Sequence, residues 1–170
     1  MGTSEQDTGT SAVPLLESVI DCVGAIAMLG GLDAEFVYRD QVALDGLHGR
    51  FESLTLDDPS VRVFTTFLAH NALPAEPTRI TVRRFRRGDC MLPQHVSGVF
   101  DPVADDVDWV SVCTLADSAV DGITFAYGDR FHRVLDVAGR ILTIDPDTWW
   151  WSSPTGEEIR YVVTVGGGNA

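Results

Sequence analysis

The side chains best suited to chemistry in this 170-residue chain are a histidine and an arginine. His95 carries the group that most readily gives or takes a proton near neutral pH. Arg160 lies in an alternating run that predicts a strand with Arg160, Val162 and Thr164 on one face. A buried or half-buried guanidinium binds a carboxylate through two parallel hydrogen bonds. The two residues therefore suggest proton transfer on a small, carboxylate-bearing substrate.

Composition and motifs exclude several other function classes. The sequence has no Gly-x-Ser-x-Gly elbow, P-loop, dinucleotide-binding glycine fingerprint or His-Glu-x-x-His pair. All twelve basic residues are arginine, so a lysine Schiff base is excluded. The formal net charge of −13 would repel a polyanion, and we expect no nucleic-acid partner.

The three cysteines, Cys22, Cys90 and Cys113, are an odd number at wide spacings. This pattern fits neither a disulfide framework nor a zinc site, and it predicts buried thiols in a reducing compartment. The N-terminus is polar and acidic, without the features of a secretory signal. The longest apolar stretch, residues 19–32, is interrupted by one aspartate and three glycines. We therefore expect a cytoplasmic protein with no membrane partner.

The elements that must position His95 and Arg160 follow from the periodicity of the apolar residues. Residues 1–11 predict a flexible tail, and residues 14–29 have the spacing of a packing helix. A second helix should begin at Asp58, whose carboxylate would cap it, and end near Asn71. Between them, Phe36, Tyr38 and Val42 fit a short strand, whereas nearby glycines favour a loop.

The pattern becomes alternating after Pro77, with turn signals such as Gly88-Asp89 between the runs. The expected strands are residues 79–86, 90–95, 107–115, 122–127, 130–135, 140–145, 148–151 and 158–165. Many short strands separated by turns favour an antiparallel barrel or jelly roll. The predicted fold is α+β, one domain over residues 12–166, with a helical part (12–75), a barrel (78–166) and a short tail (167–170).

The barrel half resembles the prolyl-hydroxylase-like branch of the Fe(II)/2-oxoglutarate-dependent oxygenases. A strand ending near Phe85 leads through the Gly88-Asp89 turn to His95-Val96-Ser97, where that family has its His-x-Asp pair. The segment 121–125 looks like the family's Gly-Gly-x-x-Phe, and residues 134–144 look like the strand before the distal histidine. The resemblance covers residues 58–166 and implies a double-stranded β-helix, which is a cupin-like jelly roll.

The resemblance also locates the departures from the family. An iron site of this type needs two histidines and one carboxylate. His95 matches the first histidine, Ser97 stands at the carboxylate position, and Trp150 stands at or beside the distal histidine position, within Trp149-Trp150-Trp151. The indole nitrogen is only a hydrogen-bond donor, so it is not an ordinary metal ligand.

The family's basic residue for 2-oxoglutarate lies about ten positions after the distal histidine, and Arg160 has that spacing from Trp150. The predicted site therefore has His95 as proton shuttle, Ser97 as hydrogen-bond donor, Arg160 as carboxylate ligand, and Trp150 and Phe85 as pocket walls. No metal or cofactor is expected.

Several interpretations stay open at this stage. Trp150 either fills the former metal cavity and packs in the core, or forms the floor of a ligand pocket. His95 is a barrel histidine, an acid–base catalyst, or a metal ligand assisted by Asp101, Asp105 or His132. A further group of arginines either lies on a solvated strand facing an acidic loop, or attracts an anionic ligand or a phosphopantetheine-bearing partner. The group comprises Arg79, Arg83, Arg84, Arg86 and Arg87. Alternation along the strand predicts that Arg83 and Arg87 lie on the side of Phe85, and that Arg84 and Arg86 lie on the other face.

Three functions are consistent with these observations. The first is a metal-independent, non-redox conversion of a small carboxylate in a biosynthetic pathway, such as a cyclisation, elimination or isomerisation. The second is a non-catalytic ligand-binding or partner subunit that keeps the barrel as a scaffold, with a carrier protein or partner enzyme as its target. The third is an iron and 2-oxoglutarate oxygenase with replacement ligands.

Overall fold

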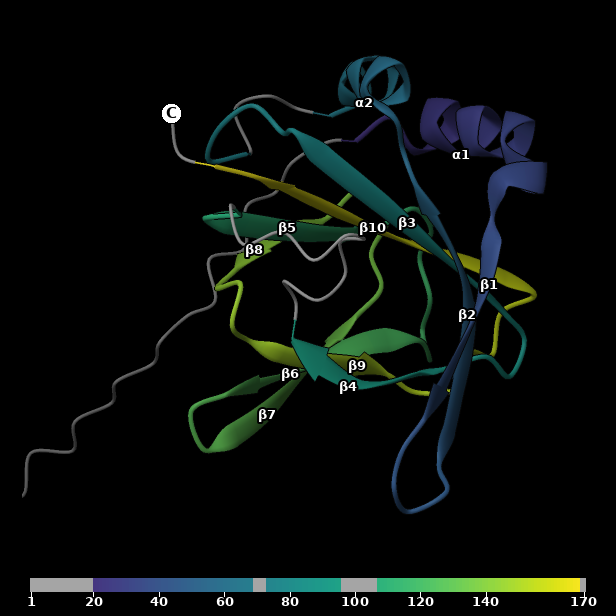
Figure 1. The fold of residues 1–170 in the computed structure, drawn as a ribbon, viewed down its shortest axis with the longest axis vertical. Coiled ribbons are helices and arrows are strands. Elements are labelled where there is room, and N and C mark those ends of the chain that lie inside the picture. Colours follow the sequence, from purple (N-terminus) through teal and green to yellow (C-terminus); the bar gives the residue numbers. More distant parts are fainter. Residues whose placement is uncertain (1–19, 69–72, 96–106, 169–170) are drawn as a thin grey trace, which may run out of the picture.

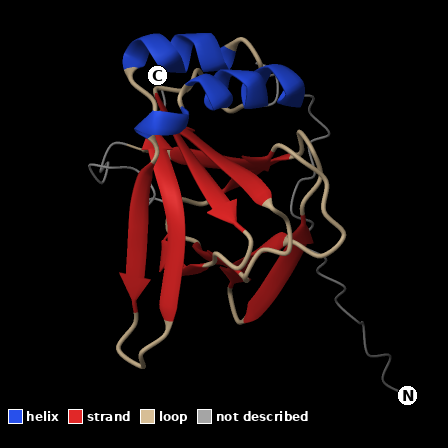
Figure 2. Cartoon of the chain, turned by 90° about the vertical axis from the view of Figure 1, so that its right-hand side faces the viewer, coloured by secondary structure: helices blue, strands red, loops and turns tan. Residues whose placement is uncertain are grey.

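The computed structural model describes residues 20–68, 73–95 and 107–168, which form two antiparallel β-sheets and two α-helices (Figure 1). The sheets face each other, and the helices lie together on one side of them (Figure 2). This is the jelly-roll arrangement that the alternating pattern and the family resemblance predicted, and the α+β fold class is confirmed.

The larger sheet contains six strands in the order β1-β2-β3-β10-β5-β8. Every neighbouring pair in it is antiparallel. Its strands are β1 (Val37–Val42), β2 (His48–Thr55), β3 (Arg79–Arg86), β10 (Ile159–Gly167), β5 (Trp109–Thr114) and β8 (Ile141–Ile144).

The smaller sheet contains four strands in the order β4-β9-β6-β7, again all antiparallel. Its strands are β4 (Met91–His95), β9 (Trp149–Ser152), β6 (Gly122–Tyr127) and β7 (Arg130–Leu135). The chain enters this sheet through the turn after β3, where Gly88 has a φ of 85°, a conformation that glycine adopts without strain. Buried Asp89 fixes this turn, because its carboxylate accepts hydrogen bonds from the Arg86 amide and the Arg50 side chain.

The helices are α1 (Cys22–Gly31) and α2 (Asp58–Thr65), with a 3-10 turn, η1 (Asp33–Glu35), after α1. They cover the outer face of the larger sheet, where Leu29 and Phe64 pack against Ile80, Val82 and other residues of one apolar core. The cap of α2 is Asp57 and not Asp58, since Asp57 accepts the Ser60 amide hydrogen.

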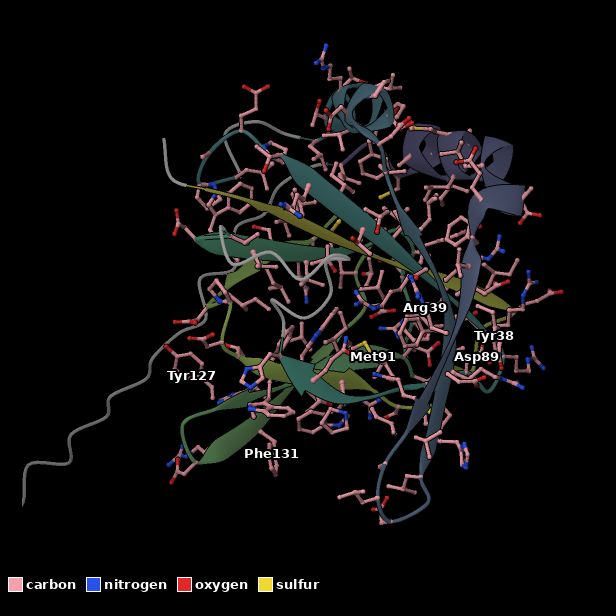
Figure 3. The ribbon with its side chains drawn as sticks, viewed as in Figure 1. Tyr38, Arg39, Asp89, Met91, Tyr127 and Phe131 are labelled. Atoms are coloured by element: carbon pink, nitrogen blue, oxygen red, sulfur yellow. The ribbon has the colours of Figure 1, made fainter. Side chains whose placement is uncertain are left out.

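A second apolar core fills the space between the two sheets. It contains Phe51, Phe85 and Val162 from the larger sheet, and Phe125 and Trp150 from the smaller one. Met91 of β4 also points between the sheets (Figure 3). Alternation along β3 and β10 explains this division, because successive side chains go to the helix-covered core and to the inter-sheet core.

All eight predicted strands of the barrel half are present, and 79–86, 122–127 and 130–135 have the predicted bounds. The stretch between the helices, where the sequence left strand and loop open, forms the β1-β2 hairpin, so residues 12–75 are not wholly helical. Helix α2 ends at Thr65, six residues before the prediction. The hydroxyl groups of Thr65 and Thr66 donate to backbone carbonyls three residues back, which competes with continued helix.

Two further expectations need correction. Among the three free cysteines only Cys113 is fully buried, whereas Cys22 and Cys90 are partly exposed. The arginine-rich strand is solvated only in part, because Arg83 and Arg84 of β3 are buried, whereas Arg86 and the following Arg87 are exposed. In the described part of the chain no helix has the length and apolar character needed to cross a bilayer.

Arg84 illustrates how the fold neutralises a buried guanidinium. Its Nε donates to Glu52 of β2 at 2.6 Å, and one terminal nitrogen donates to Asp33 of η1. Hydrogen bonds from Arg84 lower the pKa of Glu52 below its ordinary value of 4.5. A carboxyl group with a lowered folded-state pKa stabilises the protein above its unfolded-state pKa, and this contribution disappears as the pH falls through the folded-state value.

We therefore predict that Glu52→Gln lowers the free energy of unfolding at pH 7 by about 1 kcal/mol, a charged hydrogen bond partly screened by solvent. The difference from wild type should shrink as the pH falls below about 4.5. Urea denaturation across pH 3–7 measures it, with exposed Glu158→Gln as the control. A difference that is independent of pH would contradict the assignment.

Candidate functional site

The candidate site is the inter-sheet face of β3 and β10, where two arginines point into the barrel. The antiparallel register pairs Arg160 with Phe85 and Val162 with Arg83. Directly paired residues share a face, so these four side chains line the same side of the sheet. Arg83 and Arg160 are each only 3% exposed, and their environments differ sharply.

Arg160 is fully engaged by side chains of the barrel. Its Nε and Nη2 bind the two carboxylate oxygens of Asp136 at 2.5 and 2.8 Å, and Nη1 donates to the Ser152 hydroxyl at 2.5 Å. The guanidinium also lies 5.4 Å from the centre of the Phe85 ring. A bidentate, buried ion pair of this kind satisfies the charge of the arginine within the protein.

A second buried acid, Asp121, connects the loop of Asp136 to the β9-β10 connection. Its backbone carbonyl accepts the Asp136 amide hydrogen, and its carboxylate accepts hydrogen bonds from the Thr155 hydroxyl and from the amides of Gly156 and Glu157. Burial alone would raise the pKa of Asp121, but these hydrogen bonds and the charge of Arg160 lower it overall. The ionised carboxylate therefore fixes the β9-β10 connection, which leads into the strand of Arg160.

Arg83 has no such carboxylate partner among the described residues. One terminal nitrogen donates to the Thr164 hydroxyl at 3.4 Å, while Nε is buried without a hydrogen bond. The guanidinium lies 5.4 Å from the Phe51 ring centre and 5.2 Å from the Trp150 ring centre. Desolvation, together with the charge of Arg39, lowers the pKa of Arg83 to about 9, so the group is a buried cation at neutral pH.

Trp150 occupies the middle of the inter-sheet core. Its side chain is fully buried, and its ring is stacked on Phe125 with 11° between the planes. The indole Nε1 has no hydrogen-bond partner. Of the two interpretations of Trp150, core packing describes this environment. A small pocket near the end of β7, lined in part by Val112, Asp136 and Leu142, has a volume of about 10 Å³, room for about one water molecule.

His95 lies on the opposite face of the smaller sheet. It pairs with Trp149 while its neighbour Gln94 pairs with Trp150, so His95 and Trp149 project outward. The ring of His95 lies 4.2 Å from that of Trp149, its Nδ1 is 2.8 Å from the Asp147 carbonyl oxygen, and both residues are exposed. The same outer side carries the exposed Phe131 of β7, which Figure 3 shows with Tyr127 on the β6-β7 hairpin.

The structure thus brings together only part of the predicted site. Phe85, Trp150 and Arg160 line the inter-sheet core, His95 lies outside it, and Ser97 is outside the described residues. Sequence reasoning missed Asp136 and Ser152 as the partners of Arg160, since nothing in their local pattern marks them. Strand alternation did predict that Arg83 shares a face with Phe85, and this pattern indicates that Arg83 lies inside the barrel.

The described side chains at the expected iron positions do not fit that ion. His95 points away from the barrel, and the indole of Trp150 offers no lone pair to a metal. Within residues 20–68, 73–95 and 107–168, no three His, Cys, Asp or Glu side chains are close enough to share a metal ion.

Comparison with known proteins gives structural similarity alone. No family model and no curated protein matches the sequence. A prolyl-4-hydroxylase from Pseudomonas putida has a TM-score of 0.58 at 15% identity, over 88% of this chain and 87% of its own. An oxidoreductase of the 2OG-Fe(II) oxygenase family from Burkholderia pseudomallei has a TM-score of 0.57 at 10% identity, over 85% and 81%.

A third similar structure is SnoN, a non-heme alpha-ketoglutarate-dependent epimerase from nogalamycin biosynthesis. Its TM-score is 0.58 at 12% identity, over 85% of this chain and 71% of its own. The fold is therefore the jelly roll found in proteins of the 2OG-Fe(II) oxygenase family. At these identities the likeness establishes the fold, and the site must be argued from its own residues.

Removing Asp136 tests the ion pair inside the barrel. Asp136→Asn leaves Arg160 buried without a counter-charge, and we predict a loss of about 3–5 kcal/mol in the free energy of unfolding, measured by urea denaturation. The double variant Asp136→Leu/Arg160→Met should recover much of this loss, because it removes both charges. Exposed Asp129→Asn is the control and should have no measurable effect. A single variant as stable as wild type would contradict the pairing.

Proposed function

We propose that this protein is a ligand-binding jelly roll that uses the oxygenase fold without iron and without 2-oxoglutarate-dependent oxidation. The observation that carries the proposal is the position of Trp150. Its indole fills the inter-sheet core where the family resemblance expects the distal metal-binding histidine, and it is stacked against Phe125 with no exposed surface.

The location of His95 favours binding over catalysis. A proton shuttle must lie within hydrogen-bond reach of the group that it serves. His95 is on the outer face of the smaller sheet, whereas Arg83 and Arg160 point between the sheets. The acid–base residue and the candidate carboxylate ligand of the first hypothesis are therefore on different faces, and this supports the non-catalytic alternative over cyclisation, elimination or isomerisation.

The hydrogen bonds of Arg160 within the protein make Arg83, and not Arg160, the candidate residue for holding a ligand. All three of its nitrogens already bind Asp136 or Ser152, so a substrate carboxylate would have to displace a buried partner. The barrel keeps a basic interior, however, because Arg83 remains without a counter-ion in the described part of the chain. A small anion is therefore the class of ligand that this interior favours.

The test is a turnover assay of the full chain, purified without chelator. With added Fe(II) and 2-oxoglutarate, we expect no succinate above the protein-free background, and no stoichiometric iron after gel filtration. The Pseudomonas putida prolyl-4-hydroxylase serves as the positive control for the assay. Stoichiometric iron together with 2-oxoglutarate turnover that His95→Ala abolishes would overturn the proposal in favour of an oxygenase with replacement ligands.

A further inference from the structure

Arg83 is a buried cation without a carboxylate partner among the described residues, whereas the other buried arginines of the barrel have one. Three arginines on β3 and β10 are buried, namely Arg83, Arg84 and Arg160. Arg84 is bound by two carboxylates and Arg160 by one. An isolated buried charge costs several kcal/mol unless an opposite charge or strong hydrogen bonds compensate for it. Arg83 lacks such a carboxylate among the described residues, and its buried Nε has no hydrogen-bond partner.

The surroundings of Arg83 leave part of its hydrogen-bonding capacity unused. The guanidinium carbon lies over two aromatic rings, 5.4 Å from the centre of Phe51 and 5.2 Å from the centre of Trp150, and ring faces attract a cation without accepting a strong hydrogen bond. The N–H groups lie in the guanidinium plane. Nη1 uses one of them on the Thr164 hydroxyl at 3.4 Å, and the Nε–H points into the core without an acceptor.

The neighbouring side chains add donors and positive charge to this edge of the barrel. Ser53 is paired with Arg83 in the register of β2 and β3, so both share the inner face. Arg39 of β1 donates to the Ser53 hydroxyl at 2.9 Å, and its charge depresses the pKa of Arg83. Arg39 is paired with Phe51 in the register of β1 and β2, so it lies on the same sheet face as Phe51 and is exposed at the end of that face (Figure 3). Two guanidinium groups and two hydroxyl groups thus face the same region.

We propose that Arg83 binds a small carboxylate inside the barrel, gripping it through the Nε edge as Arg160 grips Asp136. This inference rests on the proposed function and deepens it by naming the residue and the class of ligand. The planar fork of a guanidinium matches the two oxygens of a carboxylate. The side chains around Arg83, among them Phe51, Trp150 and Val162, are buried, which limits the ligand to a small molecule.

Thermal unfolding of the full chain tests the proposal, with sodium acetate replacing sodium chloride at constant ionic strength. At ten times the dissociation constant of acetate, mass action predicts a rise in Tm of about 3–6 °C for wild type. Arg83→Met should abolish the rise. In chloride alone this variant should be at least as stable as wild type, since it removes an uncompensated buried cation.

Two control variants sharpen the test. Arg83→Lys keeps the charge but loses the fork, so it should retain less than half of the acetate effect. Arg87→Met removes an exposed arginine at the end of the same strand and should respond like wild type.

The inference fails if acetate and chloride give the same Tm in wild type, or if Arg83→Met responds to acetate as wild type does. Either result leaves the iron assay unaffected, so the two proposals fail separately. Iron-dependent turnover with an intact acetate response would overturn the function and keep the carboxylate site.

Discussion

The burial of guanidinium groups between two tightly packed sheets is the constraint on which the rest of the structure depends. A cation enclosed this way costs several kcal/mol unless a carboxylate or strong hydrogen bonds compensate for it. Arg160 meets Asp136, whose amide donates to the Asp121 carbonyl oxygen. The Asp121 carboxylate in turn accepts three hydrogen bonds from the β9-β10 connection. Arg84, on the helix side of the sheet, meets Glu52 and Asp33. The positions of these acids fix how the β7-β8 connection and η1 attach to the barrel.

The filled and charge-paired interior of this barrel differs from the open interior that an iron-dependent oxygenase of the same fold needs. An iron site leaves open coordination positions and room for a co-substrate. Here Trp150 and Phe125 are stacked in the inter-sheet core, and the arginine at the expected co-substrate position is bound to the protein itself. Among the residues that the structure describes, Arg83 is the buried arginine without a carboxylate partner, and the proposed anion site rests on it.

Local patterns were sufficient to predict most of the fold. Alternation in 79–86 and 158–165 identified β3 and β10 and assigned Arg83, Phe85 and Arg160 to their faces, because period-two burial is a local property. The β1-β2 hairpin was left open, since most of the residues of β1 are exposed and show no apolar alternation. The partners of the arginines could not be predicted either. Asp136 and Arg160 are 24 residues apart, and only the barrel closure brings them together.

The central claim, that an indole and not a metal centre fills the barrel, can be measured by NMR on the ¹⁵N-labelled full chain. The Trp150 indole N–H signal, assigned with Trp150→Phe, is followed while Mn(II), a paramagnetic substitute for Fe(II), and 2-oxoglutarate are added. The account predicts a slowly exchanging N–H signal that stays sharp at equimolar Mn(II), because this nitrogen is buried in the apolar core. Rapid exchange, or selective broadening of this signal at one equivalent of Mn(II), would contradict it.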